Sequence, residues 1–167
     1  MKEIPDRLKK NLNILFVGFN PSIRSSQTGH HYANPSNRFW SILYQSGLTP
    51  KKFTPDEDEK LLELGLGLTN IVARPTKGAA DIKKLEYEHG SMLLQKKIIE
   101  YKPKVVCFVG KGVYQEYAKK RNVSWGKQDH PFSSREAIEF VAPSSSGLVR
   151  MKMNEIVDIY RQLNNYI

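Results

Sequence analysis

Cysteine and long apolar runs are what this sequence most clearly lacks. Its one cysteine, Cys107, lies inside an apolar segment, which excludes a disulfide scaffold and a cysteine-based zinc site. No apolar stretch approaches the roughly 18 residues that a membrane-spanning helix needs, and residues 1–5 do not lead into the apolar core of a secretory signal. We therefore expect a soluble protein with no membrane partner, cytoplasmic and nucleoid-associated in a prokaryote or nuclear in a eukaryote.

Acidic residues are scarce relative to basic ones. The 167 residues include 26 Lys and Arg against 17 Asp and Glu, which gives a formal net charge of +9. This balance is common among proteins that bind phosphate backbones, although a merely basic, solvated surface explains it equally well. A content of 40% hydrophobic and 26% charged residues excludes wholesale disorder. The length and the absence of a linker or repeat predict one domain over residues 1–167.

Short apolar segments alternate with longer amphipathic ones along the chain. Segments of four to eight apolar, β-branched residues predict buried strands, and apolar residues at helical spacing predict helices. This alternation is typical of an α/β fold with a mainly parallel sheet. The predicted strands are residues 13–18, 66–72, 104–109 and 137–142, and the predicted helices are residues 37–45 (with Ser36 as N-cap), 56–64, 89–101, 111–119 and a terminal helix from Met153.

In such sheets, functional residues gather in the loops that follow the carboxyl ends of the strands. Here these loops are residues 18–34, 70–77, 110–111 and 143–150. The first is unusually long and rich in polar, glycine and aromatic residues, as functional or disordered loops are. The last combines small hydroxyl residues with glycine ahead of a helix, where free N–H groups bind phosphate. Leu148 within it is either a wedge inserted between base steps or a packing residue of the following helix.

Four blocks of residues in these loops carry a resemblance to a known family. They are residues 18–22 (Gly-Phe-Asn-Pro-Ser), 28–32 (Thr-Gly-His-His-Tyr), 37–40 (Asn-Arg-Phe-Trp) and 144–150 (Ser-Ser-Ser-Gly-Leu-Val-Arg). In this order they resemble the mismatch-specific uracil/thymine-DNA glycosylases of the uracil-DNA glycosylase superfamily, over about Asn13 to Leu163. The resemblance implies a three-layer α/β sandwich whose central, mainly parallel sheet has four or five strands. It also implies an enzyme without metal or cofactor.

The resemblance further implies roles for individual loop residues. Asn20 corresponds to the catalytic asparagine, and because a carboxamide is neutral, its carbonyl oxygen can only orient a water molecule. Backbone N–H groups at Phe19 and around Asn20 are then expected to stabilise charge on the departing base, which Gly18 and Phe19 are implied to bind. Tyr32 is implied to stack on the flipped base, and Asn70 to face its edge. The residues implied to bind DNA are Lys111, Ser144, Ser146, Gly147, Leu148 and Arg150.

Three features leave the details open. The adjacent His30 and His31 suggest a metal site, but no further His or Cys is spaced to complete one, and we predict no metal. A role of His31 in assisting the leaving group stays open. Ser22 stands where the family commonly has Gly, and residues 144–148 mix features of two of its branches, so the preferred base is open as well.

The sequence thus predicts a monofunctional DNA glycosylase that excises uracil mispaired with guanine, by base flipping and hydrolysis of the N-glycosidic bond in base excision repair. Thymine and alkylated or etheno cytosine are further candidate bases. We expect a monomer whose partner is double-stranded DNA with a mispaired or damaged pyrimidine opposite guanine. Two alternatives stay open: a non-catalytic DNA-binding module of the same fold, and an enzyme that acts on free nucleosides or nucleotides.

Overall fold

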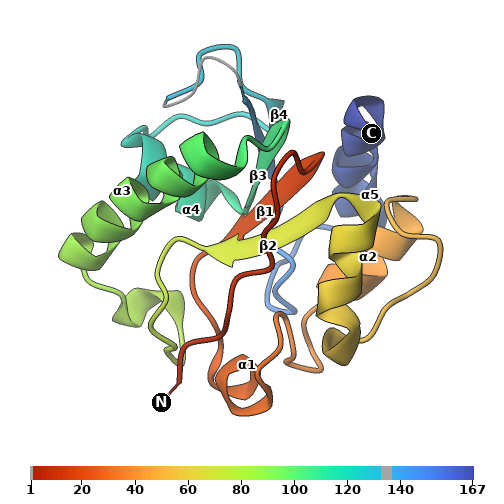
Figure 1. Cartoon of the computed structure of the whole chain (residues 1–167), viewed down its shortest axis with the longest axis horizontal. Helices are drawn as coiled ribbons and strands as arrows, with labels where there is room; N and C mark the ends of the chain where they lie inside the picture. The colour runs from red at the N-terminus through yellow and green to blue at the C-terminus, as the bar shows by residue number, and fades with distance from the viewer. Residues whose placement is uncertain (1, 133–136) are drawn as a thin grey trace.

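A five-stranded sheet in the order β2-β1-β3-β5-β4 forms the centre of the molecule (Figure 1). The computed structural model describes residues 2–132 and 137–167. Four strands run parallel, and the two-residue β4 pairs antiparallel with β5 at the edge. The strands are β1 (Ile14–Gly18), β2 (Leu66–Asn70), β3 (Val105–Val109), β4 (Gly126–Lys127) and β5 (Ile138–Ala142).

Helices cover both faces of this sheet. The α-helices are α1 (Ile23–Thr28), α2 (Phe39–Gln45), α3 (Lys84–Tyr101), α4 (Lys111–Ala118) and α5 (Met153–Arg161), and the 3-10 helices are η1 (Pro55–Leu64), η2 (Ala79–Asp81) and η3 (Gln162–Tyr166). One core cluster joins β-strand residues to α2 and α5, and a second joins them to α3 and α4. The predicted three-layer α/β sandwich is therefore confirmed, with five strands.

The strands at the centre follow directly from their sequences. Every residue of β1 and β3 is buried, as a continuous apolar run requires in a parallel strand covered on both faces. Successive side chains of a strand point to opposite faces. Accordingly, Ile14 and Phe16 belong to the cluster under α2 and α5, whereas Leu15 and Val17 belong to the one under α3 and α4.

The prediction of the helix over residues 37–45 was wrong at its start. The helix, α2, begins at Phe39, and Ser36 does not cap it: the N-cap position is Arg38, and the side-chain oxygen of Asn37 accepts a 3.0 Å hydrogen bond from the backbone N–H of Phe39. The segment predicted as the next helix is the 3-10 helix η1.

The long helix α3 begins five residues before the predicted residue 89. The carboxylate of Glu86 accepts a 2.8 Å hydrogen bond from the backbone N–H of Lys83, which satisfies a free donor of the first turn. The strand predicted over residues 66–72 ends at Asn70, and β4 was not predicted.

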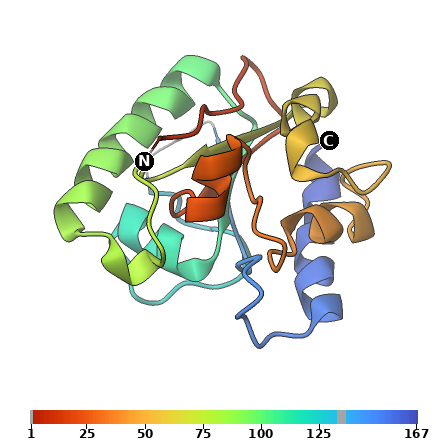
Figure 2. The ribbon, with the colours of Figure 1, turned by 90° about the horizontal axis from the view of Figure 1, so that it is seen from below.

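The first loop is more ordered than its composition suggests, because it contains α1. Ser22 caps this helix by accepting a 3.1 Å hydrogen bond from the backbone N–H of Ser25. In the view from below, α1 and the segment leading into α5 lie at the same edge of the sheet (Figure 2). This is the edge at which the parallel strands end.

The N-terminal segment extends the sheet beside the edge strand β2. Arg7 and Leu68 exchange two backbone hydrogen bonds of 2.8 and 2.9 Å in an antiparallel bridge on the free side of β2. Among the described residues, no helix has the length and apolar character that crossing a bilayer requires.

Candidate active site at the carboxyl edge of the sheet

A pocket of about 340 Å³ opens at the carboxyl edge of the parallel strands. It brings together six residues of the predicted site, from three of the four predicted loops: Asn20, Tyr32, Asn70, Ser146, Gly147 and Leu148. Ser22 and His31, whose roles the sequence left open, line it as well. It also includes Ile4, which was not predicted, and Lys77, which lies in the predicted loop 70–77 but was not singled out. Ile4 reaches the pocket only through the fold, because its segment is far from the motifs along the chain.

The amide of Asn20 has a fixed orientation at the end of β1. Its Nδ2 donates two hydrogen bonds of 2.8 Å, to the backbone oxygen of Arg74 and to the hydroxyl of Thr76. The Arg74 carbonyl can only accept, and the Thr76 hydroxyl already donates to the backbone oxygen of Gly78 at 2.8 Å. The nitrogen must therefore face these two groups. Within the described part of the chain Oδ1 has no donor, and it is the Asn20 atom left for a ligand in the pocket.

Gly18 allows Asn70 and Tyr32 to approach the end of β1. A Cβ at position 18 would lie 2.8 Å from Oδ1 of Asn70 and 2.9 Å from the hydroxyl of Tyr32. Such distances are too short for a side chain, so only glycine fits here without displacing both groups. Tyr32 and Asn70, which line the pocket, thus form one tightly packed wall against Gly18, which does not itself line it.

The ring of Tyr32 is held in place from behind. It stacks on Phe39 with 3.9 Å between ring centroids and 13° between planes, and its backbone oxygen accepts a 3.2 Å hydrogen bond from the indole of Trp40. Its φ of 51° is unusual for a residue with a side chain, which marks a conformation enforced by the surroundings. Burial raises the pKa of Tyr32 well above its ordinary value, so the phenol stays protonated at neutral pH.

The loop before α5 is clamped on both sides of its tip. The guanidinium of Arg38 donates to the backbone oxygens of Ser146 and Val149, at 3.1 and 3.3 Å. The backbone N–H of Arg38 donates to the backbone oxygen of Ser145 at 2.9 Å. Between these anchors Leu148 projects outward with 92% of its surface exposed. It is therefore not a packing residue of the following helix.

His31 serves a structural contact in this structure. Its ring is buried, and Nε2 lies 2.8 Å from the backbone oxygen of Pro5, to which it donates. Burial lowers the pKa of His31 below its ordinary value. Its backbone N–H donates to the carboxylate of Asp58 at 2.9 Å. Nε2 is thus held by Pro5, while His31 also lines the pocket, and a role in assisting the leaving group stays a prediction.

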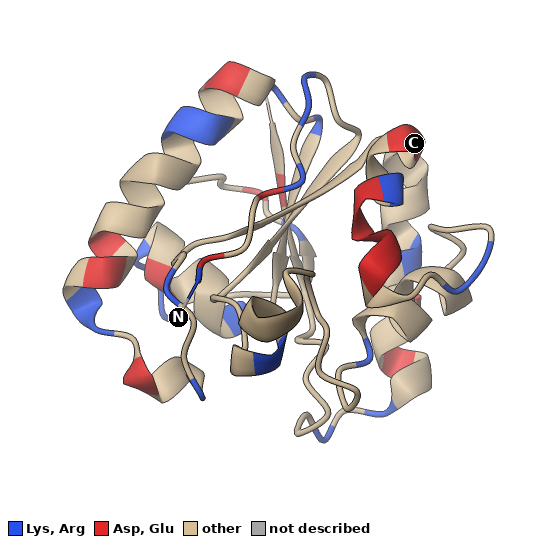
Figure 3. Cartoon of the chain, turned by 60° about the horizontal axis from the view of Figure 1, so that its bottom comes forward, with Lys and Arg blue, Asp and Glu red and all other residues tan. Residues whose placement is uncertain are grey.

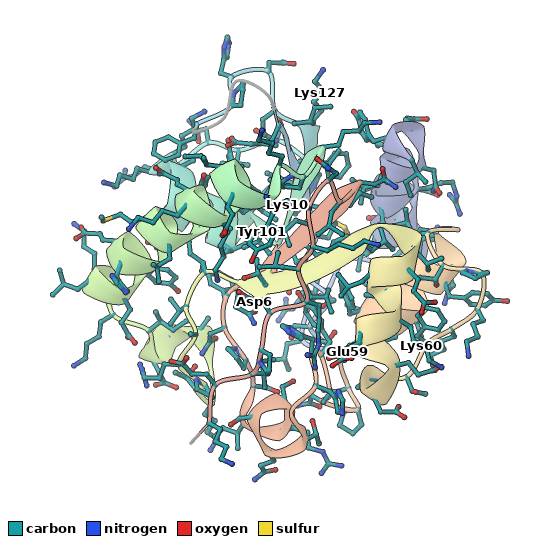
Figure 4. The ribbon with its side chains drawn as sticks, viewed as in Figure 1. Asp6, Lys10, Glu59, Lys60, Tyr101 and Lys127 are labelled. Carbon is teal, nitrogen blue, oxygen red and sulfur yellow. The ribbon has the colours of Figure 1, made fainter. Side chains whose placement is uncertain are left out.

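Asp58 ties three segments together beneath the pocket. Its carboxylate is fully buried, and one of its oxygens lies 3.2 Å from both Nε of Arg7 and Nδ1 of His30. The side chain of the neighbouring Glu59, which also pairs with Arg7, is 73% exposed. Figure 4 labels Glu59 on η1. In sequence Asp58 lies within an acidic run that reads as a solvated face, so its burial could not be predicted.

The remaining predicted residues lie outside the pocket. The side chain of Phe19 packs on Tyr87 between α3 and α4, so only its backbone is available to a base. The ammonium of Lys111 lies 4.2 Å from the ring centroid of Trp125. Arg150 is exposed, and the hydroxyl of Ser144 accepts a 3.2 Å hydrogen bond from the backbone N–H of Ser146.

Charge and donor sets at this edge fit a polar, anionic ligand better than a metal. Lysine and arginine recur on the loops that face forward in Figure 3, and Lys77 is among the residues of the pocket. No group of three or more His, Cys, Asp or Glu residues suited to a metal ion occurs among the described residues.

Comparison with known proteins agrees with this arrangement. The family model of the uracil DNA glycosylase superfamily matches residues 5–167, and the chain belongs to this superfamily. The fold is similar to the solution NMR structure of a "putative Uracil DNA glycosylase" from Methanosarcina acetivorans, with 23% identity, a TM-score of 0.61 and 98% of each chain covered. The superfamily acts on DNA and supports DNA glycosylase activity as the general function.

Proposed function

We propose that this protein hydrolyses the N-glycosidic bond of uracil mispaired with guanine in double-stranded DNA. The observation that carries the proposal is the fixed amide of Asn20, whose two N–H groups are bound by Arg74 and Thr76 and whose oxygen is left for the pocket. A neutral amide oxygen can hold a water molecule but cannot take its proton as a strong base would.

The reaction then depends on departure of the base. The bond between the sugar C1′ and the base nitrogen breaks with its electron pair going to the base, and the oriented water adds its oxygen to C1′. Of the water's two protons, one stays on the new sugar hydroxyl and the other balances the charge of the base. The products are the free base and an abasic site, and no cofactor takes part. Backbone N–H groups around Gly18 and Phe19 stabilise the charge on the leaving base.

Tyr32 and Asn70 give the pocket its fit to a pyrimidine. Stacking of Tyr32 on the flipped base contributes about 1–3 kcal/mol and depends little on which base it is. Asn70, beside Gly18, offers a donor and an acceptor to the base edge. Thymine and etheno or alkylated cytosine are the further bases to test, because an amide can pair with several edges.

The clamped loop accounts for a preference for mispaired duplex. Leu148 projects from a backbone held by Arg38 and so can fill the gap that the flipped nucleotide leaves. Flipping costs a few kcal/mol, and least where the pair is already mismatched. Uracil opposite guanine is therefore expected to leave faster than uracil opposite adenine.

A panel of duplexes tests this function. Uracil, thymine, ethenocytosine and hypoxanthine are placed opposite guanine and opposite adenine, and abasic sites are counted after single-turnover incubation. The proposal predicts that uracil opposite guanine is released fastest. Tight DNA binding without abasic sites would instead identify a non-catalytic DNA-binding module, and weak binding with little salt dependence would indicate a small-molecule enzyme.

Leu148→Ala separates the wedge from the chemistry. The variant is expected to lose the advantage of mispaired duplex while it releases uracil from single strands, where no gap needs filling, at nearly the wild-type rate. Equal slowing on both substrates would contradict the wedge.

A further inference from the structure

The outer face of α3 carries an apolar stripe that nothing in the described chain covers. Leu85, Met92 and Ile99 are 77%, 60% and 73% exposed, and they recur every seven residues, which is two helical turns. The opposite side of the helix is buried through Leu94 and Ile98. The stripe therefore lies on the solvent-facing side of α3 and is not part of the core.

Charged residues on this face are arranged symmetrically about Met92. Glu88 lies four residues before it and Lys96 four residues after it, and both are exposed. Among the described residues neither has an ion-pair partner, unlike Glu86, which binds Arg74. In Figure 3 basic and acidic bands alternate along α3, from basic at its start through acidic and basic to acidic at its end.

We propose that α3 is a homodimer interface in which two copies pack antiparallel about a twofold axis at Met92. In that arrangement Met92 meets Met92 of the second copy, and Leu85 meets Ile99 of the second copy at each end. Glu88 lies at the same height as Lys96 of the second copy, within reach of a long side chain. A parallel pair would instead bring like charges together, so the pattern selects the antiparallel one.

A hollow lies next to the apolar stripe, on the side of α3 that faces α4. It has a volume of about 290 Å³ and lies between α3 and α4. Its lining consists of Lys84, Tyr87, Glu88, Ser91, Glu116 and Lys119. The C-terminal half of the second copy's α3, with Ile99 and the basic Lys96, passes at this height. The lysines and glutamates of its lining balance, so the hollow contributes shape and no charge preference to this face.

The interface leaves the active-site pocket of each copy accessible. In the view from below, α3 runs along the margin of the molecule, away from α1 and from the segment before α5 (Figure 2). The contact consists of few apolar pairs, so association is expected to be weak and to depend on protein concentration. It differs from the monomer expected from the sequence, which stays a prediction, and it does not rest on the proposed function.

Sedimentation of the full-length protein from low to high micromolar concentration tests this interface. The wild type is expected to shift from monomer to dimer. Met92→Glu places two like charges on the axis and is expected to weaken association at least about tenfold. Leu93→Glu is the matched control, because Leu93 is 40% exposed but points about a quarter turn away from the stripe, and it is expected to dimerise as the wild type does.

Charge exchange and cross-linking test the register. Glu88→Lys is expected to weaken association, and the double variant Glu88→Lys, Lys96→Glu to restore it. Met92→Cys is expected to form a disulfide-linked dimer under mild oxidation and Leu93→Cys is not, and the natural Cys107 is buried and gives no background. A protein that stays monomeric throughout, or equal effects at positions 92 and 93, would overturn the proposal.

Discussion

The side-chain amide of Asn20 donates a 2.8 Å hydrogen bond to the hydroxyl of Thr76, which lies 56 positions further along the chain. Because that hydroxyl donates its one hydrogen to the backbone oxygen of Gly78, it can only accept a hydrogen bond from Asn20. Thr76 thus decides which way the Asn20 amide faces, although it is absent from the motif that contains the asparagine.

Thr76→Val is expected to slow uracil excision about tenfold, which corresponds to about 1.4 kcal/mol of activation free energy lost with the orientation of Asn20. DNA affinity is expected to stay near the wild-type value, because Thr76 acts through Asn20. Thr76→Ser, which keeps the hydroxyl, is the matched control and is expected to retain most of the rate. Single-turnover excision and equilibrium binding are measured side by side, and equal losses in both Thr76 variants would argue against this positioning role.

Gly18→Ala is expected to impair excision at least tenfold, because its Cβ would force Asn70 and Tyr32 apart. Gly78→Ala is the control, since a Cβ there comes no closer than 4.0 Å to a neighbouring heavy atom. Excision rates of the two variants are compared after circular dichroism has established that both are folded. Wild-type activity in Gly18→Ala would mean that this wall of the pocket does not touch the base.

Asp58→Ala is expected to reduce the free energy of unfolding by about 3 kcal/mol, since it leaves Arg7 without its buried partner and the backbone N–H of His31 without an acceptor. Glu59→Ala removes the exposed partner of the same arginine and is expected to cost less than about 1 kcal/mol. Urea denaturation of the two variants measures the difference. Similar losses would show that burial of the ion pair is not what stabilises this region.

The buried His31 predicts a dependence of stability on pH. Because burial lowers its pKa below 6.5 in the folded protein, the unfolded chain takes up the proton first as the pH falls. Stability is therefore full above pH 6.5 and declines as the pH drops through the lowered pKa. His31→Gln, which keeps a donor for Pro5, is expected to flatten this decline, and the exposed His130→Gln is not. Unfolding free energies between about pH 5 and about pH 7 test the sign, and an unchanged slope in His31→Gln would contradict it.

The sequence allowed prediction of those parts of the fold whose signals are local. β1 and β3 are continuous apolar runs, and such runs predict buried strands without further context. β4 has two residues, one of them Gly126 with a φ of 89°, and no pattern can develop over so short a segment. The start of α3 was missed because its cap is the Glu86 carboxylate, three residues inside the helix, and not a side chain at Lys83.

The residues of the candidate site likewise include some that the sequence allowed us to predict and some that it did not. Asn20, Tyr32 and Asn70 could be predicted because they follow strands or lie in a recognisable block, and the pocket brings them together. Ile4 and Thr76 reach the site through contacts between distant segments, for which periodicity and composition carry no information. The roles of the gathered residues stay predictions, and so does the phosphate contact expected of Lys111.

The most direct test of the central claim is the single-turnover rate of Asn20→Ala on duplex DNA with uracil opposite guanine, measured together with its affinity for the same duplex. Asn154→Ala, an exposed asparagine on α5, is the control. If the oxygen of Asn20 holds the attacking water, excision by Asn20→Ala is expected to fall at least about 100-fold while DNA affinity changes little and the control is unaffected. An excision rate near that of the wild type would contradict the assignment of this pocket as the active site.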